Sequence, residues 1–457
     1  MKSSKVIRLF KSGNKNNVDN FRPISILPAF SKIFEKLILK QLLRHFNLNS
    51  LLHDEQYGFT KGRSTTDAGV ALMKLIFNAW ENSQNAFGVF CDLSKAFDCV
   101  HHDTLLRKLR HYGVQNEALN VINSYLHNRL QCVDVNGVKS SQLPFQLGVP
   151  QGSILGPFLF LVYINDLPFY LKGICDVVLF ADDTSLIFKV DRNRQDFDDV
   201  NSALSMVTDW FTTNNLVLNA KKTKCIKFAL PNVRNLGPNI VLNKVVLETV
   251  DSAVFLGITV DAKLQWASHV SSLAGRLSSA AYAVRKVRQY TDVDTARLVY
   301  FSYFHSVMSY GILLWGKAAD IQNIFVLQKR AVRAIYQLGA RVSLRDFFKD
   351  IGILTVASQF IFANILYIRQ NLHLYSKNSD IHNINTRNKD KLRVPFHRLH
   401  KVHNSFVGLG ITFYNKLPSS LLDLPFNAFK TKVKSNLCSK AYYCINDYLN
   451  DKESWSL

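Results

Sequence analysis

The chain has 457 residues, and its 56 Lys and Arg residues outnumber its 34 Asp and Glu residues to give a formal net charge of +22. Apolar residues make up 47 % and aromatic residues 12 % of the chain, a composition that supports a large core and excludes wholesale disorder. At ~150 residues per domain, this length allows roughly two to four domains. A basic balance on a folded chain predicts a polyanionic partner, usually nucleic acid.

The sequence lacks the features of a membrane or secreted protein. Its longest uncharged stretch, residues 140–165, is interrupted by prolines, whereas a spanning helix needs ~20 mostly apolar residues. The N-terminus has no apolar core of the kind found in signal peptides. Seven cysteines form no CxxC pair, which suits a reducing compartment. We therefore expect a nuclear or cytoplasmic protein, or one found in both places, without a membrane partner.

Elements can be predicted along the chain from the spacing of apolar residues. Residues 1–20 are basic and rich in Asn, and we expect order to begin at residue 21. Helical spacing predicts helices over 30–46, 67–80, 202–219, 270–287, 293–316 and 321–338, and a glycine- and proline-rich loop leads into another near 154. Short apolar runs predict strands at 87–91 and 221–230 and hairpins at 177–190 and 254–261. A basic linker at 376–403 precedes a compact C-terminal piece at 404–450.

Three aspartates stand where two of these apolar runs end. Asp92 follows the run 87–91, and Asp182 and Asp183 lie at the tip of the hairpin over 177–190. Each alone is typical of turns or helix caps. If the two runs are neighbours in one sheet, their carboxylates converge, and clustered carboxylates need cations such as Mg²⁺ to offset their repulsion. Two such ions ~3.5–4 Å apart suit in-line phosphoryl transfer, here on nucleic acid.

The motifs around these aspartates resemble those of reverse transcriptases. FADD (180–183), CDLSKAFD (91–98) and GVPQGSILGPFLF (148–160) are similar to three ordered motifs of that family, and FRPISILPAFSKIFEK (21–36) and QYGFTKGRSTTD (56–67) resemble its fingers motifs. The set is most similar to enzymes of non-LTR (LINE-type) retrotransposons of the jockey-like clade, over a core of residues 6–338. FADD in place of YMDD argues against a retroviral enzyme. Group II intron maturases and telomerase share the carboxylates, but the fingers and the tail segment 417–437 favour the jockey-like clade.

The resemblance implies a fold class and a division of the chain. The fold is expected to be α+β, a right-hand polymerase with fingers, a palm with an antiparallel sheet, a helical thumb and a small C-terminal region. The expected parts are fingers at 1–85, a palm with interleaved fingers elements at 86–262, the thumb at 263–345, and a C-terminal region at 346–457 that includes the basic linker.

The resemblance also implies the catalytic and metal-binding residues. Asp92, Asp182 and Asp183 would hold two Mg²⁺ ions, with Mn²⁺ as a substitute, and the backbone carbonyl of Leu93 would be a further ligand. Lys222 matches a lysine that protonates the leaving pyrophosphate, although its neighbours Lys221 and Lys224 compete for that role.

Further positions match the nucleotide-binding residues of the family. Phe97 matches the steric gate that excludes a 2′-OH, with ordinary core packing as the alternative. Gln151 and Gly152 would contact the nucleotide, or else form a structural turn. Arg22 and Lys11 match the basic residues that hold the triphosphate, and Lys15 competes with Lys11 for this role.

The remaining matches concern the template and the primer. Lys61 and Arg63 would follow template phosphates, with a solvated loop as the alternative. Phe255, Leu256 and Gly257 resemble the primer grip. Basic helices of the thumb, with Arg285 and Arg288, would hold backbone phosphates without reading sequence.

The chain is therefore predicted to be an RNA-directed DNA polymerase of a non-LTR retrotransposon. Its partners would be an RNA template, a DNA primer and dNTPs. The sequence contains no recognisable endonuclease, RNase H or CCHC knuckle, so we expect a 5′-truncated or exapted copy of an element, or a fragment of a longer open reading frame. A non-catalytic relic that only binds nucleic acid is the alternative.

Overall fold

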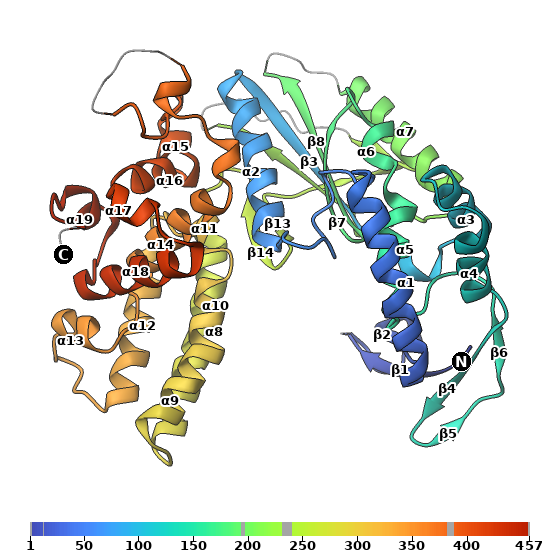
Figure 1. The fold of residues 1–457 in the computed structure, drawn as a ribbon, viewed down its shortest axis with the longest axis horizontal. Helices are drawn as coiled ribbons and strands as arrows, with labels where there is room; N and C mark the ends of the chain where they lie inside the picture. The colour runs from blue at the N-terminus through green and yellow to red at the C-terminus, as the bar shows by residue number, and fades with distance from the viewer. Residues whose placement is uncertain (1, 12, 193–196, 231–239, 382–387, 456–457) are drawn as a thin grey trace. The chain divides into compact units, whose positions relative to one another are not determined.

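The computed structural model describes residues 2–11, 13–192, 197–230, 240–381 and 388–455. The chain divides into two compact units, the first formed by residues 1–79 and 83–251 and the second by 80–82 and 252–457. Figure 1 labels the helices and strands of both units.

The first unit combines helices with two larger sheets. Its strands are β1 (Ser3–Phe10), β2 (Phe21–Ile26), β3 (Gln84–Cys91), β4 (Arg129–Val135), β5 (Val138–Lys139), β6 (Leu143–Phe145), β7 (Asp176–Phe180), β8 (Asp183–Asp191), β9 (Lys224–Phe228), β10 (Val241–Leu242), β11 (Val245–Val246) and β12 (Glu248–Thr249). Its α-helices are α1 (Ala29–Leu48), α2 (Thr65–Glu81), α3 (His102–His111), α4 (Asn116–Leu126), α5 (Gly156–Ile164), α6 (Leu167–Tyr170) and α7 (Asp198–Thr213). This combination of sheets and helices belongs to the α+β class, as predicted.

One five-stranded sheet carries the predicted aspartates. Its strand order is β12-β9-β3-β8-β7, and all pairs are antiparallel except β12 with β9. The largely antiparallel sheet and the β7–β8 hairpin are as predicted. A second sheet, β2-β1-β4-β5 with β6 paired to β4, contains the N-terminal segment.

Apolar helices cover one face of the aspartate-bearing sheet. Helices α5 and α7 share one core with Phe87, Val89 and Cys91 of β3, the alternate residues that a strand directs to one face (Figure 1). Every residue of α5 except Pro157 is buried. A helix that is apolar on all sides belongs in a core, so α5 is a rigid support behind the sheet.

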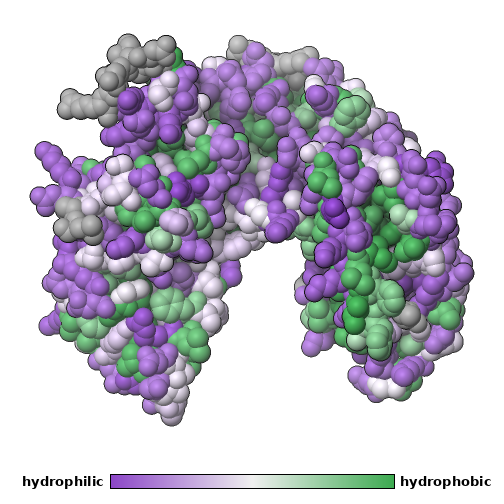
Figure 2. Space-filling view, viewed as in Figure 1, coloured by the Kyte–Doolittle hydropathy of each residue, from purple (hydrophilic) through white to green (hydrophobic). Residues whose placement is uncertain are grey.

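Helix α1 is confirmed, but its buried side differs from the apolar spacing in the sequence. Its buried residues are Ser31, Glu35, Leu42 and Phe46. Apolar side chains instead lie on its surface, as Figure 2 illustrates, and Phe30, Ile33, Phe34 and Leu37 are all more than half exposed.

The second unit is mainly helical. It contains the hairpin β13 (Ser252–Phe255) and β14 (Ile258–Asp261) and the helices α8 (Ala267–Arg288), α9 (Val293–Val299), α10 (Ser306–Ser309), α11 (Ile312–Trp315), α12 (Ile321–Tyr336), α13 (Arg345–Asp350), α14 (Val356–Gln370), α15 (His400–His403), α16 (Phe406–Asn415), α17 (Ser419–Leu422), α18 (Phe426–Lys440) and α19 (Ile445–Asn450). Helix α8 packs on α12, and α14 packs on α16 and α18.

Three sequence-based boundaries were wrong. Order begins at strand β1 rather than at residue 21, because β1 pairs with both β2 and β4. The helix predicted over 202–219 ends at Thr213, since Asn215 adopts a left-handed φ of 54°. The helix predicted over 293–316 passes through a π-helical stretch and breaks at Gly311, whose φ is 61°.

The described part of the basic linker predicted at 376–403 makes specific contacts. Residues 382–387 of this prediction lie outside the described residues. Within the second unit, the Glu81 carboxylate accepts hydrogen bonds from the backbone N–H groups of Arg398 (2.8 Å) and Leu399 (3.1 Å). Among the described residues, none of the helices has the length and apolar character that crossing a membrane requires.

Candidate active site

The predicted aspartates meet at one end of the five-stranded sheet. In the register of β3 and β8, Cys91 pairs with Thr184. Asp92 follows Cys91 and Asp183 precedes Thr184, so the two aspartates leave neighbouring strands at the same end. Asp182 lies in the two-residue turn before Asp183. The backbone register thus brings the three aspartates together at one end of the sheet, as expected from the sequence.

The turn that carries Asp182 has an unusual backbone. Phe180 pairs with Asp183, so Ala181 and Asp182 form the loop of a tight hairpin. Ala181 has a φ of 56°, in the left-handed region. This conformation costs a non-glycine residue roughly 1–2 kcal/mol, and such strain persists only where the surroundings hold it.

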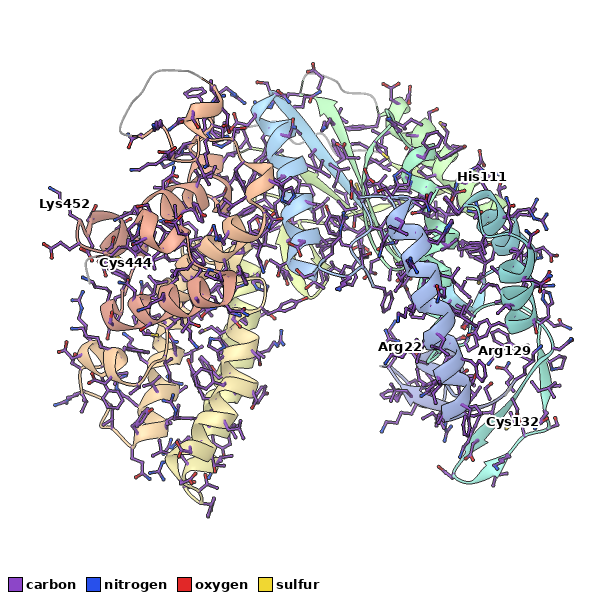
Figure 3. The ribbon with its side chains drawn as sticks, viewed as in Figure 1. Arg22, His111, Arg129, Cys132, Cys444 and Lys452 are labelled. Atoms are coloured by element: carbon purple, nitrogen blue, oxygen red, sulfur yellow. The ribbon has the colours of Figure 1, made fainter. Side chains whose placement is uncertain are left out.

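The carboxylates interact electrostatically with one another and with cations from the N-terminal segment. Burial, reinforced by Asp92, raises the pKa of Asp182, while Arg22 and Lys11 act in the opposite direction. Burial, with the charges of Asp182 and Asp92, raises the pKa of Asp183 to about 6, again opposed by Lys11. Figure 3 labels Arg22, which lies on β2. These mutual effects are those expected of clustered carboxylates.

The donor atoms suit a hard divalent cation, although they do not form a complete protein cage. Among the described residues, no group of three or more His, Cys, Asp or Glu side chains is arranged to hold a metal. Mg²⁺ in polymerase-type sites is usually bound by one or two carboxylates together with substrate phosphates. Leu93 faces Leu218 in an isolated bridge whose hydrogen bonds are made by the residues on either side. The Leu93 carbonyl therefore points away from Leu218. Carboxylate and carbonyl oxygens are suitable ligands for Mg²⁺, and phosphate oxygens of a substrate would complete its coordination.

The raised pKa of Asp183 predicts a gain in stability on neutralisation. A carboxyl whose pKa is raised from 3.8 to about 6 contributes stability that is present below pH 3.8 and lost as the pH rises through 6. Asp183→Asn should therefore raise Tm at pH 8 by about 2 °C and leave it unchanged near pH 3.5. Differential scanning calorimetry without divalent ions measures this, and an equal or lower Tm at pH 8 would contradict the electrostatic picture.

The predicted steric gate lies close to this site and is partly packed. The ring of Phe97 is half-buried and stacks on Phe160, with centroids 4.7 Å apart. Its carbonyl accepts a hydrogen bond from the N–H of Val149 at 2.8 Å. Phe97 thus joins the CDLSKAFD segment to the loop of Gln151, and its ring keeps an exposed part that a nucleotide could meet.

Gln151 and Gly152 have structural contacts of their own. Gln151 Nε2 donates to Asp98 Oδ1 at 2.9 Å, and the Gln151 carbonyl accepts from Ser25 N at 2.7 Å. Gly152 has a φ of 112°, and a Cβ there would lie 2.6 Å from the Ser25 carbonyl oxygen. Only glycine fits this approach of strand β2, so the alternative of a structural turn holds for Gly152 at least in part.

Lys222 stands in a turn that is fastened to the first aspartate. The N–H of Asn219 donates to the Asp92 carbonyl at 2.9 Å, and the N–H of Asp92 donates to Thr223 Oγ1 at 3.4 Å. Lys222 lies between these anchors and is exposed. Of its two competitors, Lys221 is equally exposed, whereas Lys224 lies on β9 and forms an ion pair with Glu248.

The two lysines proposed to bind the triphosphate, Lys11 and Lys15, have different surroundings in the structure. Lys11 acts on the pKa of both Asp182 and Asp183. The ammonium group of Lys15 instead lies over the ring of Phe10, 5.6 Å from its centroid. This favours Lys11 over Lys15.

Lys61 and Arg63 differ in their surroundings. Lys61 is exposed. The guanidinium of Arg63 forms an ion pair with Asp54 at 2.5 Å, donates to the Gln56 carbonyl at 3.2 Å and lies over the ring of Tyr57. Arg63 thereby holds the 54–57 segment together, which competes with a role on template phosphates.

The predicted primer grip belongs to the second unit and forms a tight hairpin. Leu256 and Gly257, with φ values of 47° and 79°, are the loop between the paired residues Phe255 and Ile258. The Phe255 side chain is buried. The hydroxyl of Tyr310 donates to the Leu256 carbonyl at 2.6 Å. Backbone atoms of the loop are therefore more exposed to a ligand than the Phe255 ring.

The two predicted thumb arginines, also in the second unit, differ in their exposure and in their hydrogen bonds. Arg285 is exposed on α8. Arg288 donates from Nε to the Ile335 carbonyl at 2.9 Å and from Nη1 to the Thr291 carbonyl at 2.8 Å. Arg288 thus ties the ends of α8 and α12 together, and Arg285 is the freer cation for a phosphate.

Two buried polar residues near the site carried no predicted role. Glu35 is 1 % exposed, and its Oε2 accepts hydrogen bonds from the N–H groups of Ile154 (2.7 Å) and Leu155 (3.2 Å), directly after the Gln151 loop. Gln56 is 3 % exposed and contacts the turn of Asp182. Both stand inside the quoted fingers motifs, but only the folded chain brings them to the site.

One sheet carries clustered aspartates at neighbouring strand ends, and cations from the N-terminal segment lie in electrostatic range. This arrangement is typical of sites that act on phosphates. The family model "Reverse transcriptase (RNA-dependent DNA polymerase)" matches residues 13–260, more than half of the sequence, and the chain belongs to this family. The resemblance to jockey-like non-LTR enzymes is confirmed by the relatives found.

Two of these relatives come from Drosophila melanogaster. The probable RNA-directed DNA polymerase from transposon BS is 30 % identical over 376 residues, which are 78 % of this chain and 41 % of the relative. The RNA-directed DNA polymerase from mobile element jockey is 30 % identical over 368 residues, 77 % of this chain and 39 % of the relative. The chain thus spans about two-fifths of the length of these curated relatives. Among solved structures, telomerase from Candida tropicalis with an RNA fragment is 12 % identical, with a TM-score of 0.47 over 96 % of this chain and 64 % of that one.

Proposed function

We propose that this chain catalyses RNA-directed DNA synthesis as the polymerase of a non-LTR retrotransposon. The observation that carries the proposal is the meeting of Asp92, Asp182 and Asp183 at one end of a sheet in a chain of the reverse transcriptase family. In the reaction, the primer 3′-OH gives its proton to water, and its oxygen bonds to the α-phosphorus of a dNTP. The bond from that phosphorus to the oxygen bridging to the β-phosphate breaks, and pyrophosphate leaves.

The residues of the site divide this work. The three carboxylates and the Leu93 carbonyl would hold two divalent cations, Mg²⁺ or Mn²⁺. Such ions, when bound, supply positive charge at the attacking and leaving oxygens. Arg22 and Lys11, which already act on the pKa of Asp182, would bind the triphosphate through charge-assisted hydrogen bonds.

Other residues of the first unit would bind the nucleotide and assist its reaction. Lys222 would give a proton to the departing pyrophosphate. Phe97 would close the space that a 2′-OH needs, and the Gln151–Gly152 turn would lie against the incoming nucleotide.

Contacts with the template and the primer involve both units. Lys61 would follow template phosphates from the first unit, with Arg63 ordering its loop. In the second unit, the backbone of the loop at 255–257 and the exposed Arg285 would contact the primer strand, and Arg288 would support α8. We propose residues 1–85 as fingers, 86–262 as palm, 263–345 as thumb and 346–457 as a C-terminal region.

A gain-of-function variant tests this proposal. Wild-type protein should extend an oligo(dT) primer on poly(rA) with dTTP and Mg²⁺. Phe97→Val should raise incorporation of UTP relative to dTTP by about 10²-fold, because the smaller side chain leaves room for the 2′-OH. A contaminating polymerase would not acquire this change.

The same experiment separates an enzyme from a relic. A folded wild-type protein that binds the primer–template with salt-dependent affinity but adds no nucleotide would indicate a non-catalytic relic. Extension with unchanged sugar selectivity in Phe97→Val would contradict the role of Phe97 as the gate.

A further inference from the structure

The segment that precedes helix α2 runs beside the strand leading to Asp182. The N–H of Leu179 on β7 donates to the Glu55 carbonyl at 2.9 Å, and the N–H of Tyr57 donates to the Leu179 carbonyl at 2.8 Å. These bonds form a parallel bridge between Gln56 and Leu179. The segment is therefore hydrogen-bonded to the strand two residues before the hairpin turn.

The side chain of Gln56 continues this contact into the turn. Its Oε1 accepts hydrogen bonds from the N–H of Ala181 at 3.0 Å and from the N–H of Gly58 at 2.7 Å. Gln56 is 3 % exposed, so water does not compete for these bonds. Ala181 is the residue with the left-handed φ of 56°, and Asp182 follows it directly. A buried acceptor thus satisfies the backbone N–H of the strained residue next to the aspartate.

The backbone on the other side of this contact is also fitted to the turn. A Cβ at Gly58 would lie 2.3 Å from the Ala181 nitrogen and 2.8 Å from the Phe180 carbonyl carbon. No side chain has room there, so the segment and the turn are in direct contact over both Gln56 and Gly58.

We propose that Gln56 is a positioning residue for the aspartate turn. By accepting the hydrogen bond of the Ala181 N–H, it holds the left-handed backbone that directs Asp182 toward Asp92. This inference rests on the proposed polymerase function for its catalytic consequence. The hydrogen bond that it invokes can be tested without activity.

The design separates a positioning role from a merely structural one. Gln56→Met keeps the volume and removes the acceptor. Gln56→Glu keeps an Oε acceptor, replaces Nε2, which has no partner among the described residues, and introduces an ionisable carboxyl. Asn85→Leu is the matched control, because Asn85 is another buried amide of the same unit, at the far end of β3 from Asp92. All four proteins are compared as full chains for Tm, for hydrogen exchange of peptides covering residues 178–185, and for primer extension over a series of Mg²⁺ concentrations.

Gln56→Met should speed hydrogen exchange of the Ala181 amide. It should also lower kcat by about 10–100-fold and raise the Mg²⁺ concentration for half-maximal rate. The KM for dTTP should change by less than about 3-fold. Gln56→Glu should keep the slow exchange. Asn85→Leu should leave both exchange at residue 181 and the Mg²⁺ dependence unchanged, because Asn85 does not contact the turn.

Two results would overturn the inference: unchanged exchange at Ala181 in Gln56→Met, or faster exchange with wild-type kcat and Mg²⁺ dependence. If the wild-type protein extends no primer, the proposed function fails, and the exchange rates still decide whether Gln56 holds the turn.

Discussion

Asp182→Asn is expected to lower the rate of nucleotide addition by about 10³-fold or more, with the affinity for primer–template little changed. Asparagine keeps the size of the side chain but removes the charge that would bind a divalent cation. Burial and Asp92 raise the pKa of Asp182, so loss of this charge also relieves repulsion and should not unfold the protein. Single-turnover extension at saturating Mg²⁺ measures the rate, and filter binding measures the affinity.

Asp176→Asn is the matched control for this experiment. Asp176 begins strand β7, whose other end leads into the turn of Asp182, and it forms a partly exposed ion pair with Lys189 at 2.8 Å. Such pairs contribute ~0–1 kcal/mol, so its rate should stay within about 3-fold of wild type. Activity of Asp182→Asn above about a tenth of the wild-type rate would show that another group carries the chemistry.

Glu35→Leu is expected to destabilise the first unit by about 3 kcal/mol or more. The buried Glu35 carboxylate accepts hydrogen bonds from the N–H groups of Ile154 and Leu155 and from the hydroxyl of Ser31. Leucine leaves the buried N–H of Leu155 and the partly buried N–H of Ile154 without an acceptor, which costs ~1–3 kcal/mol each. Thermal unfolding should show Tm lowered by about 6–12 °C.

Two further variants define the cause of that loss. Glu35→Gln keeps an acceptor oxygen and should cost only about 1 kcal/mol. Glu117→Leu, at an exposed position of α4, should change stability by no more than about 0.5 kcal/mol. If Glu35→Leu is as stable as Glu35→Gln, the two backbone hydrogen bonds contribute little, and α5 is held by packing alone.

The carboxylate cluster could be predicted because its determinants are local. The β7–β8 hairpin is encoded by two apolar runs around Asp182 and Asp183. The run before Asp92 is continuously apolar, as is typical of a strand buried on both faces. Only their adjacency in one sheet had to be inferred. The π-helical stretch and the break at Gly311 have no comparable pattern, because an apolar helix and a broken one share the same spacing.

The contacts that support the cluster could not be predicted, because they join distant segments. Periodicity in α1 placed Ile33 and Leu37 on the apolar stripe, yet the buried side holds Glu35 because the start of α5, about 120 residues later, needs an acceptor. Gln56 likewise meets Ala181 across 125 residues of sequence. A glutamate or glutamine in a fingers motif carries no signal of such a partner.

The segment beside β7 has a consequence for solubility. Strand β7 is an edge of the five-stranded sheet, and an exposed edge strand offers unpaired N–H and C=O groups to other chains. The backbone of Glu55 and Tyr57 occupies the hydrogen-bonding groups of Leu179 on that edge, and the opposite edge strand, β12, has only two residues. Among the described residues, neither margin of the sheet is therefore a long open template for intermolecular β-pairing, which lowers the tendency of the protein to aggregate through this sheet.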